Sequence, residues 1–339
     1  MQIGLFHSIQ WPEGSDQSDR YTQALTQACH ADALGFDSVW LTEHHFSRHG
    51  IVSDSLMVLA HLAAHTSHVR LGTAVSVLPL HHPLRFAEAA ATVDQLSHGR
   101  VDLGIGRGYQ PGEFRGFGVD IAEKYERFDE ALDVLRKVWS SEAPVSHSGK
   151  YYAFEDAAPQ PRPFQKPHPP LWLATDSPDG LALCAEEDFG VLLPQGTSLT
   201  VTAGQMKRYA DALVGAGQGP ERARAYLARA TYVAPTDEQA WADAEGPYKG
   251  FLNYADQLRR ATESGGENGG RSPFDLDADL RSSVLFGSPD TVIAGLREIR
   301  ALGIERVMLF VHMGALPHEK IMASLDLFAT EVLPVVRDL

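Results

Sequence analysis

Short runs of β-branched and other apolar residues alternate along the first half of the chain with longer stretches in which apolar residues recur at helical spacing. Such alternation is typical of βαβ units and a parallel sheet. Four strands are predicted here, at 3–7, 38–42, 69–78 and 101–107. The helices that follow them are predicted at 20–34, where Gly35 closes the helix, and at 54–65, 84–96 and 122–139.

The second half is less regular, but the same alternation resumes. Residues 145–170 contain six prolines and predict an insertion that crosses the surface, with a short hairpin as one option. Four more strands are predicted at 171–174, 190–193, 225–233 and 306–311, with a closing helix at 316–336. Eight strands with intervening helices favour a closed (β/α)₈ TIM barrel over an open doubly wound sheet. We expect one domain over residues 1–339, with insertions after strands four and seven.

One segment, 263–283, breaks this pattern. It contains two Gly-Gly pairs and almost no apolar residue in its first half. Long loops of this kind are either functional lids or passive surface segments. Because Phe274 and Leu276 give the second half something to bury, we predict a mobile lid over the active site, with a passive loop as the alternative.

The composition is that of a globular protein, 44% hydrophobic and 22% charged, with a formal net charge of −15. This charge argues against nucleic acid and an anionic membrane surface as partners, although a local arginine and backbone N–H groups suffice for one phosphate. The two cysteines, Cys29 and Cys184, show no metal-ligand spacing. No signal peptide or apolar span of membrane length is visible, so we expect a cytoplasmic protein.

The second predicted strand ends in Glu43, His44 and His45, at the position where barrels of this type carry their chemistry. A carboxylate and two imidazoles supply an acid-base pair and hydrogen-bond donors. Together with His49 they are also potential metal ligands. Adjacent residues of an extended chain point to opposite faces and no H-E-x-x-H spacing is present, which disfavours a metal. A structural role for either imidazole in the loop is the remaining alternative.

The fourth predicted strand ends in a glycine-rich run around Arg107. Gly104, Gly106 and Gly108 let a ligand approach the backbone closely, and Arg107 is suited to bind a phosphate. The run does not match the dinucleotide-binding fingerprint, because its third glycine is misplaced and no acidic residue ends a second strand about 20 residues on. Barrel-closing glycines beside an exposed arginine would explain the run equally well.

Together these segments resemble the bacterial luciferase-like flavin monooxygenases. The resemblance is carried by residues 43–46 (EHHF), 72–75 (GTAV), 94–108 (DQLSHGRVDLGIGRG) and 114–118 (FRGFG), and it returns at 176–177, 287–289 and 302–303. The segments occur in the same order and at similar spacing over nearly the whole chain. This collinearity is more specific than any single motif, and the match is nearest to the luciferase α-chain branch.

The resemblance implies that FMN binds at the carboxyl-terminal mouth of the barrel. Arg107 would hold the FMN phosphate, with Asp176 and Ser177 from the loop after strand five nearby. Gly106 and Tyr109, which flank Arg107, are expected to contact the cofactor as well.

The resemblance also assigns the residues around the flavin ring. Ala74 and Val75 match a pair joined by a non-prolyl cis peptide beneath the isoalloxazine ring, and Glu43 would approach the same part of the pocket. His44 matches the catalytic histidine, which acts as a base or proton donor beside the flavin. His45, its neighbour, is the second catalytic candidate.

Two positions depart from the luciferase pattern. Luciferase α chains have a reactive cysteine where this chain has Gly106, so no thiol lies there, and we expect room for a bulkier substrate. A second phosphate-binding arginine aligns with Tyr125, and Arg127 is the nearby residue that would have to replace it.

The sequence therefore predicts a two-component monooxygenase. A separate flavin reductase would supply reduced FMN, O₂ would be the co-substrate, and an aldehyde, ketone or aromatic compound would be oxygenated with His44 as proton shuttle. We expect a homodimer. The nearest alternative is a deazaflavin-dependent dehydrogenase or reductase on the same fold. A non-catalytic flavin-binding partner, like the luciferase β chain, is disfavoured by the intact run Glu43-His44-His45.

Overall fold

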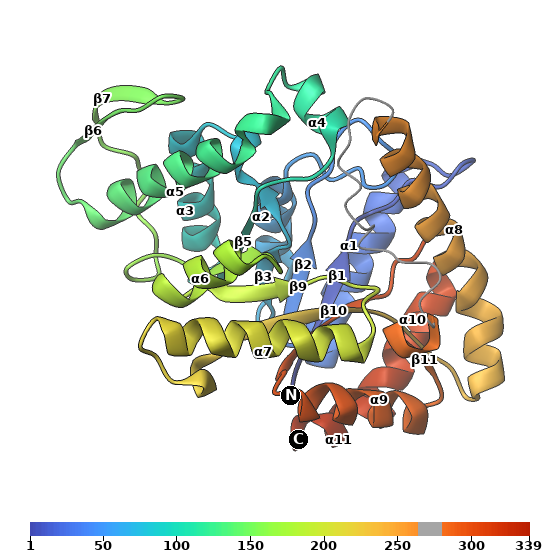
Figure 1. Ribbon diagram of the computed structural model, residues 1–339. Coiled ribbons are helices and arrows are strands. Elements are labelled where there is room, and N and C mark those ends of the chain that lie inside the picture. Colours follow the sequence, from blue (N-terminus) through green and yellow to red (C-terminus); the bar gives the residue numbers. More distant parts are fainter. Residues whose placement is uncertain (264–279) are drawn as a thin grey trace.

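Eight parallel strands close into a barrel in the computed structural model, which describes residues 1–263 and 280–339 (Figure 1). Pairing of β9 with β10 and of β12 with β1 completes the ring, which confirms the predicted barrel. The barrel strands are β1 Gln2–His7, β2 Ser38–Leu41, β3 Arg70–Thr73, β5 Val101–Gly106, β8 Leu171–Ala174, β9 Gly190–Leu193, β10 Ala225–Val233 and β12 Arg306–Phe310.

Helices surround the barrel, and the main hydrophobic core lies between them and the strands (Figure 1). In α1, the Asp16 carboxylate accepts a hydrogen bond from the N–H of Asp19 at the start, and Gly35, at a φ of 84°, ends the helix as predicted. Among the described residues, no helix is long and apolar enough to cross a membrane. The longer helices are α1 Gln17–Leu34, α2 Ser55–His65, α3 Pro83–Leu96, α5 Lys124–Ser140, α6 Pro178–Glu186, α7 Leu199–Gly215, α8 Asp237–Glu263, α9 Pro289–Ala301 and α10 His318–Leu327.

Two predicted elements are divided. The strand predicted at 69–78 consists of β3 and β4 (Ser76–Val77), separated by the cis peptide between Ala74 and Val75 that was predicted there. The closing helix predicted at 316–336 consists of α10, a π-helical turn at Phe328–Val332 and α11 (Leu333–Arg337). Pro334 explains why the closing helix is interrupted, because it has no N–H to continue the α-helical hydrogen bonds.

One strand, β11 (Val284–Gly287), was not predicted. It pairs with the carboxyl-terminal half of β10, beyond the part of β10 that pairs with β9. Its four residues follow a polar segment directly, so the sequence offers too short an apolar run to separate from a loop.

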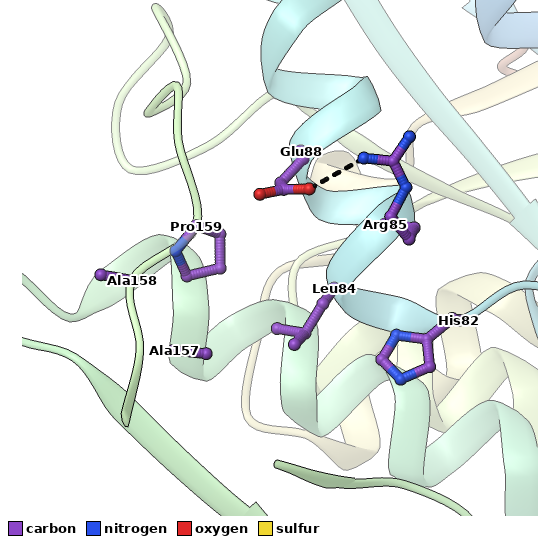
Figure 2. Close-up of a pocket in the computed structure, with 7 residues that line it drawn as sticks. All are labelled: His82, Leu84, Arg85, Glu88, Ala157, Ala158 and Pro159. Atoms are coloured by element: carbon purple, nitrogen blue, oxygen red, sulfur yellow. Dashed lines mark hydrogen bonds and ion pairs between the residues drawn. The ribbon is translucent and has the colours of Figure 1, made fainter. Parts of the chain in front are cut away.

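The proline-rich insertion forms the expected hairpin, from β6 (Val145–Ser148) and β7 (Ala153–Ala157). Glu130 of α5 holds its turn by accepting hydrogen bonds from the N–H groups of Tyr151 and Tyr152. An open surface hollow lies between the end of this hairpin and the start of α3, lined by His82, Leu84, Arg85, Glu88, Ala157, Ala158 and Pro159 (Figure 2).

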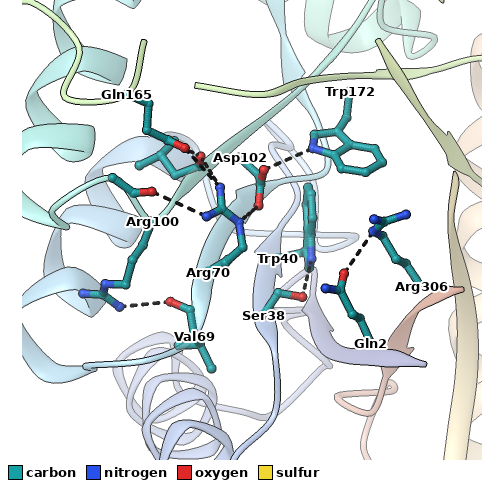
Figure 3. A network of polar contacts seen from close by, with 12 residues as sticks. Gln2, Ser38, Trp40, Val69, Arg70, Arg100, Asp102, Gln165, Trp172 and Arg306 are labelled. Atoms are coloured by element: carbon teal, nitrogen blue, oxygen red, sulfur yellow. Dashed lines mark hydrogen bonds and ion pairs between the residues drawn. The ribbon is translucent and has the colours of Figure 1, made fainter. Parts of the chain in front are cut away.

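Aromatic rings fill the amino-terminal end of the barrel. Trp40 lies 4.7 Å from Tyr226 and 6.1 Å from Trp172, measured between ring centroids. A Cβ atom at Gly72 would lie 2.2 Å from the Trp40 ring, so only glycine fits beneath it. Polar groups border the rings: Asp102 accepts from Trp172 Nε1 at 3.3 Å and from Arg70 Nε at 2.5 Å (Figure 3). This end of the barrel is closed, which leaves the opposite end for a ligand.

Candidate active site

A cavity of about 450 Å³ lies at the mouth of the barrel, where the carboxyl ends of the strands meet. Every barrel strand, or the loop directly after it, contributes to the lining. One residue from each is, in chain order, Phe6, Thr42, Ala74, Gly106, Ala174, Leu192, Ala228 and Met308. This is the part of a barrel where ligands usually bind.

The structure brings nearly all of the predicted site residues together in this cavity. Those that line it are Glu43, His44, Ala74, Val75, Gly106, Arg107, Tyr109, Asp176 and Ser177. His45 lies behind the wall instead: its Nε2 is 3.0 Å from Oε1 of Glu43, and its ring packs edge-on against Phe117. His45 therefore contacts the site through Glu43.

Two positively charged side chains line the cavity without a carboxylate at ion-pair distance among the described residues, although Arg107 acts at longer range on Asp129, where its charge opposes the rise in pKa that burial causes. Arg107 follows β5 and Lys124 begins α5, and neither forms an ion pair with any residue that the structure describes. Nε of Arg107 is buried without a hydrogen-bond partner. Burial, and then the positive charge of Arg107, lower the pKa of Lys124. Two neighbouring cations and an unsatisfied N–H group together form a site for an anion.

The loop after β8 extends this side of the cavity. Thr175, Asp176 and Ser177 line it, and the Ser177 hydroxyl caps α6 by accepting a hydrogen bond from the N–H of Gly180 at 3.2 Å. A helix N-terminus attracts negative charge, which adds to the effect of the two cations. The Asp176 carboxylate suits neutral donors such as hydroxyl groups, because it only accepts hydrogen bonds.

The sequence leaves open whether Tyr125 or Arg127 assists phosphate binding. Tyr125 lines the cavity, but Arg127 does not. Arg127 Nε is 2.8 Å from a carboxylate oxygen of Glu123, and its guanidinium lies over the Tyr151 ring. Lys124, which belongs to no sequence motif, is the second cation of the cavity.

Glu43 is a buried carboxylate held between two imidazoles. Its Oε1 lies 3.0 Å from Nε2 of His45, and its Oε2 lies 2.8 Å from Nε2 of His81. Burial would raise the pKa of Glu43, but the hydrogen bonds from His45 and His81 lower it to about 2. Burial acts to lower the pKa of His81, yet the Glu43 carboxylate raises it above the usual 6.5. Glu43 and His81 thus form a charge pair in the cavity wall.

His44 lines the cavity, and the described residues engage only one of its two ring nitrogens. Its Nδ1 lies 3.0 Å from Oε1 of Glu113 and 3.0 Å from Nε2 of Gln110. Its Nε2 forms no hydrogen bond with the residues that the structure describes. Beside it, burial lowers the pKa of His49 well below the usual value, so that imidazole is neutral. Nε2 of His44 is therefore the ring atom that can exchange a proton with a ligand.

Val75 and Gly106 lie next to each other in the lining of the cavity. A Cβ atom at position 106 would lie 2.6 Å from Cγ2 of Val75. The extra room that the sequence analysis expected at Gly106 is therefore taken up by Val75.

The remaining predictions concern a metal and a lid. Within residues 1–263 and 280–339, no three histidine, cysteine or acidic side chains are grouped to bind a metal ion. His61 and His65 stack on each other on α2, with ring centroids 4.3 Å apart. The predicted lid, 263–283, falls mostly on residues 264–279, which lie outside the described residues.

Three residues in or beside the site were not predicted from the sequence: Lys124, His81 and Glu113. Glu113 lies in α4 (Pro111–Gly116), and a proline at the first position of a helix is a known start signal that would have pointed to this short helix. His81 and Lys124 belong to no motif, and only the fold brings Lys124 to the cavity and His81 to the Glu43 carboxylate.

Comparisons with known proteins agree with the observed fold. Residues 1–306 match the family model described as luciferase-like monooxygenase. The chain is similar to the oxygenase component of the flavin-dependent trigonelline monooxygenase of Acinetobacter baylyi, with 28% identity covering 98% of this chain and 95% of that protein. It is also similar to the crystal structure of monooxygenase RslO1 from Streptomyces bottropensis, with a TM-score of 0.86 and 30% identity over 99% of both chains. An F420-dependent secondary alcohol dehydrogenase shares the fold, with a TM-score of 0.76 and 20% identity over 99% of both chains.

The His81–Glu43 pair predicts a pH-dependent contribution to stability. Because the folded state raises the pKa of His81, its charge stabilises the fold fully below its unfolded value near 6.5, and this contribution is lost as the pH rises through the folded value. His81→Gln should therefore lower the free energy of unfolding by about 1–3 kcal/mol at about pH 6 and by much less at about pH 9. Urea unfolding at both values measures this. The control is His82→Gln, and equal losses at both pH values for His81→Gln would contradict the charge pair.

The Val75–Gly106 contact predicts a compensating pair of substitutions. Gly106→Ala should destabilise the protein by about 1–3 kcal/mol, because the new methyl group overlaps Val75. Val75→Ala should remove most of that loss when combined with it, giving a coupling energy of at least about 0.5 kcal/mol. Denaturant unfolding of both single variants and the double variant completes the cycle. Additive losses would mean that the two side chains do not compete for the same space.

Proposed function

Since the chain belongs to the luciferase-like monooxygenase family, we propose that it is the oxygenase of a two-component system. A separate flavin reductase supplies reduced FMN, and the enzyme transfers one atom of O₂ to an organic substrate. The observation that carries the proposal is one cavity with an unpaired two-cation site and a free imidazole nitrogen of His44. The expected homodimer and cytoplasmic location stay predictions.

The residues on the cation side fit FMN. Arg107 and Lys124 would hold the phosphate, together with the N-terminus of α6 at Ser177. Asp176 would accept hydrogen bonds from ribityl hydroxyl groups. Tyr109, Ala74 and Val75, with Gly106 behind Val75, would border the ring. Reduced FMN, when bound, supplies the electrons and the carbon framework on which O₂ is activated.

The protein's own residues handle protons and exclude water. Nε2 of His44 would take up or return a proton next to the reacting group. Glu43 would keep a negative charge close to the ring at neutral pH, balanced by His81 and fixed by His45. The aromatic rings at the amino-terminal end close the barrel from below, so water cannot reach the cavity from that side.

The cavity lining also includes apolar side chains that would receive the substrate. Among them are Phe6, Leu192, Leu193, Phe251 and Met308. A hydrocarbon surface gains about 25 cal/mol per Å² when it is buried against such side chains. This favours an aldehyde, ketone or aromatic compound with a largely apolar body.

The alternative is hydride transfer with a deazaflavin, and its support is the fold shared with the F420-dependent dehydrogenase. The decisive experiment supplies the purified chain with a flavin reductase, NADH, FMN and a panel of aldehydes, ketones and aromatic compounds under ¹⁸O₂. A product that contains one ¹⁸O atom supports the monooxygenase. In a parallel assay, reduced F420 replaces the reductase, NADH and FMN. If it passes its hydride to one of the aldehydes or ketones, giving the alcohol at the same rate with and without O₂, and no labelled product forms, the dehydrogenase is supported instead.

The cation pair predicts which substitutions weaken FMN binding. Arg107→Ala should cost about 1.5–3 kcal/mol, the range for hydrogen bonds to a charged group, and Lys124→Ala somewhat less. Riboflavin, which lacks the phosphate, should lose much less in both variants. Isothermal titration of the two ligands measures the difference. Arg127→Ala is the matched control, because Arg127 is paired with Glu123 outside the cavity. Equal losses of affinity for FMN and riboflavin would show that Arg107 and Lys124 do not bind the phosphate.

The proposed role of His44 predicts that its removal impairs oxygen transfer but not FMN binding. His44→Ala should bind FMN normally but oxygenate a substrate about 10²–10⁴-fold more slowly, because a positioned acid-base group is missing. Hydrogen peroxide should then account for most of the reduced FMN consumed. His45→Ala, whose side chain lies outside the cavity, is the comparison. Full oxygenation by His44→Ala would show that His44 is not the proton shuttle.

A further inference from the structure

Glu113 is a buried carboxylate directly beside the candidate catalytic histidine. It lies in α4 and is only 2% exposed. Its Oε1 is 3.0 Å from Nδ1 of His44 and also accepts a hydrogen bond from the backbone N–H of His45 at 3.0 Å. Among the described residues, Glu113 forms no ion pair with a lysine or arginine, so the His44 imidazole is the group that can balance its charge.

Two side chains compete for Nδ1 of His44. Gln110 Nε2, at 3.0 Å, would donate a hydrogen bond to an unprotonated Nδ1, whereas Glu113 would accept one from a protonated Nδ1. A neutral imidazole can satisfy only one of them, because it carries its proton on one nitrogen. A hydrogen bond to a carboxylate is roughly twice as strong as one between neutral groups. Gln110 can also turn its amide, but a carboxylate can only accept.

The residues that follow His44 in the sequence pack against its ring and keep it in this orientation. A Cβ atom at Gly50 would lie 3.0 Å from Cδ2 of His44, so the backbone packs closely against that edge of the ring. The His49 ring lies edge-on, with centroids 4.7 Å apart. With Nδ1 engaged and the ring packed, the protonation of Nδ1 decides whether Nε2 offers a lone pair or a proton to the cavity.

We propose that Glu113 is a positioning residue that holds His44 as the Nδ1–H tautomer, with the lone pair of Nε2 facing the cavity. This deepens the proposed function, in which His44 exchanges a proton with the bound cofactor or substrate. His44 then enters the reaction as a base, and the Glu113 carboxylate lies where it offsets the positive charge that the ring gains. The logic is that of the buried carboxylate in catalytic triads, which fixes the tautomer of the adjacent imidazole.

The test reads the tautomer directly, in the protein without flavin. The chain is labelled with ¹⁵N-histidine, and a long-range ¹H–¹⁵N spectrum is recorded at about pH 9, above the usual histidine range. The His44 signals are assigned by their absence in His44→Gln. The proton-bearing type of ¹⁵N shift should belong to Nδ1. A wild-type spectrum with that shift at Nε2 would overturn the proposal, even if no variant folds.

Three variants separate a positioning role from a purely structural one. In Glu113→Ala the proton should move to Nε2, because Gln110 then donates to Nδ1. In Glu113→Gln it should stay on Nδ1, because the amide oxygen must remain on the His45 N–H. In Gln110→Leu it should stay as well. If Glu113 only anchors the loop through His45, Glu113→Ala will fold less stably but leave the His44 tautomer unchanged, which would refute the proposal.

Turnover provides a second arm that depends on the proposed function. In Glu113→Ala, the yield of oxygenated product per reduced FMN consumed should fall nearly as far as in His44→Ala, with FMN affinity unchanged. Because the tautomer is measured without flavin, the spectrum can refute the role of Glu113 while the His44 result stands. Conversely, a normal product yield in His44→Ala would refute the proposed shuttle without changing the spectrum.

Discussion

Closure of the ring of parallel strands is the constraint on which the site depends. Parallel pairing of β12 with β1 and of β9 with β10 leaves no free edge among the barrel strands, and it brings all carboxyl ends to one mouth. Residues as distant in sequence as Phe6, Ala174 and Met308 therefore line one cavity. The aromatic rings at the other end leave this mouth as the place where the protein can receive a ligand.

Within that mouth, some charged side chains contact a group of the protein that can balance their charge, and others do not. The carboxylates of Glu43 and Glu113 contact imidazoles, which can carry a balancing charge. Arg107 and Lys124 have no such partner among the described residues. An anion such as the phosphate of the proposed FMN would balance these two half-buried cations, and the imidazole side offers groups that can exchange a proton.

The sequence predicts what local pattern determines. The bounds of β8, β9 and β10 follow from apolar runs between turn residues, and the catalytic candidates follow from motifs at strand ends. Lys124 and Glu113 could not be found in this way, because each acts through a neighbour that only the tertiary fold supplies. The space at Gly106 was misjudged for the same reason: glycine at 106 shows that a side chain is absent, but only the fold shows that Val75 fills the gap.

The segment between Arg107 and Lys124 joins the two sides of the cavity. Its ends carry the two cations, and its middle carries α4 with Glu113, which contacts His44. Phe114, 1% exposed, fixes α4 beneath the chain, and a Cβ atom at Gly108 would lie 2.7 Å from its ring. The two side chains that would hold the anion and the carboxylate that contacts the imidazole therefore belong to one short stretch of backbone. This single segment of the chain positions both the cation side of the cavity and the candidate catalytic histidine.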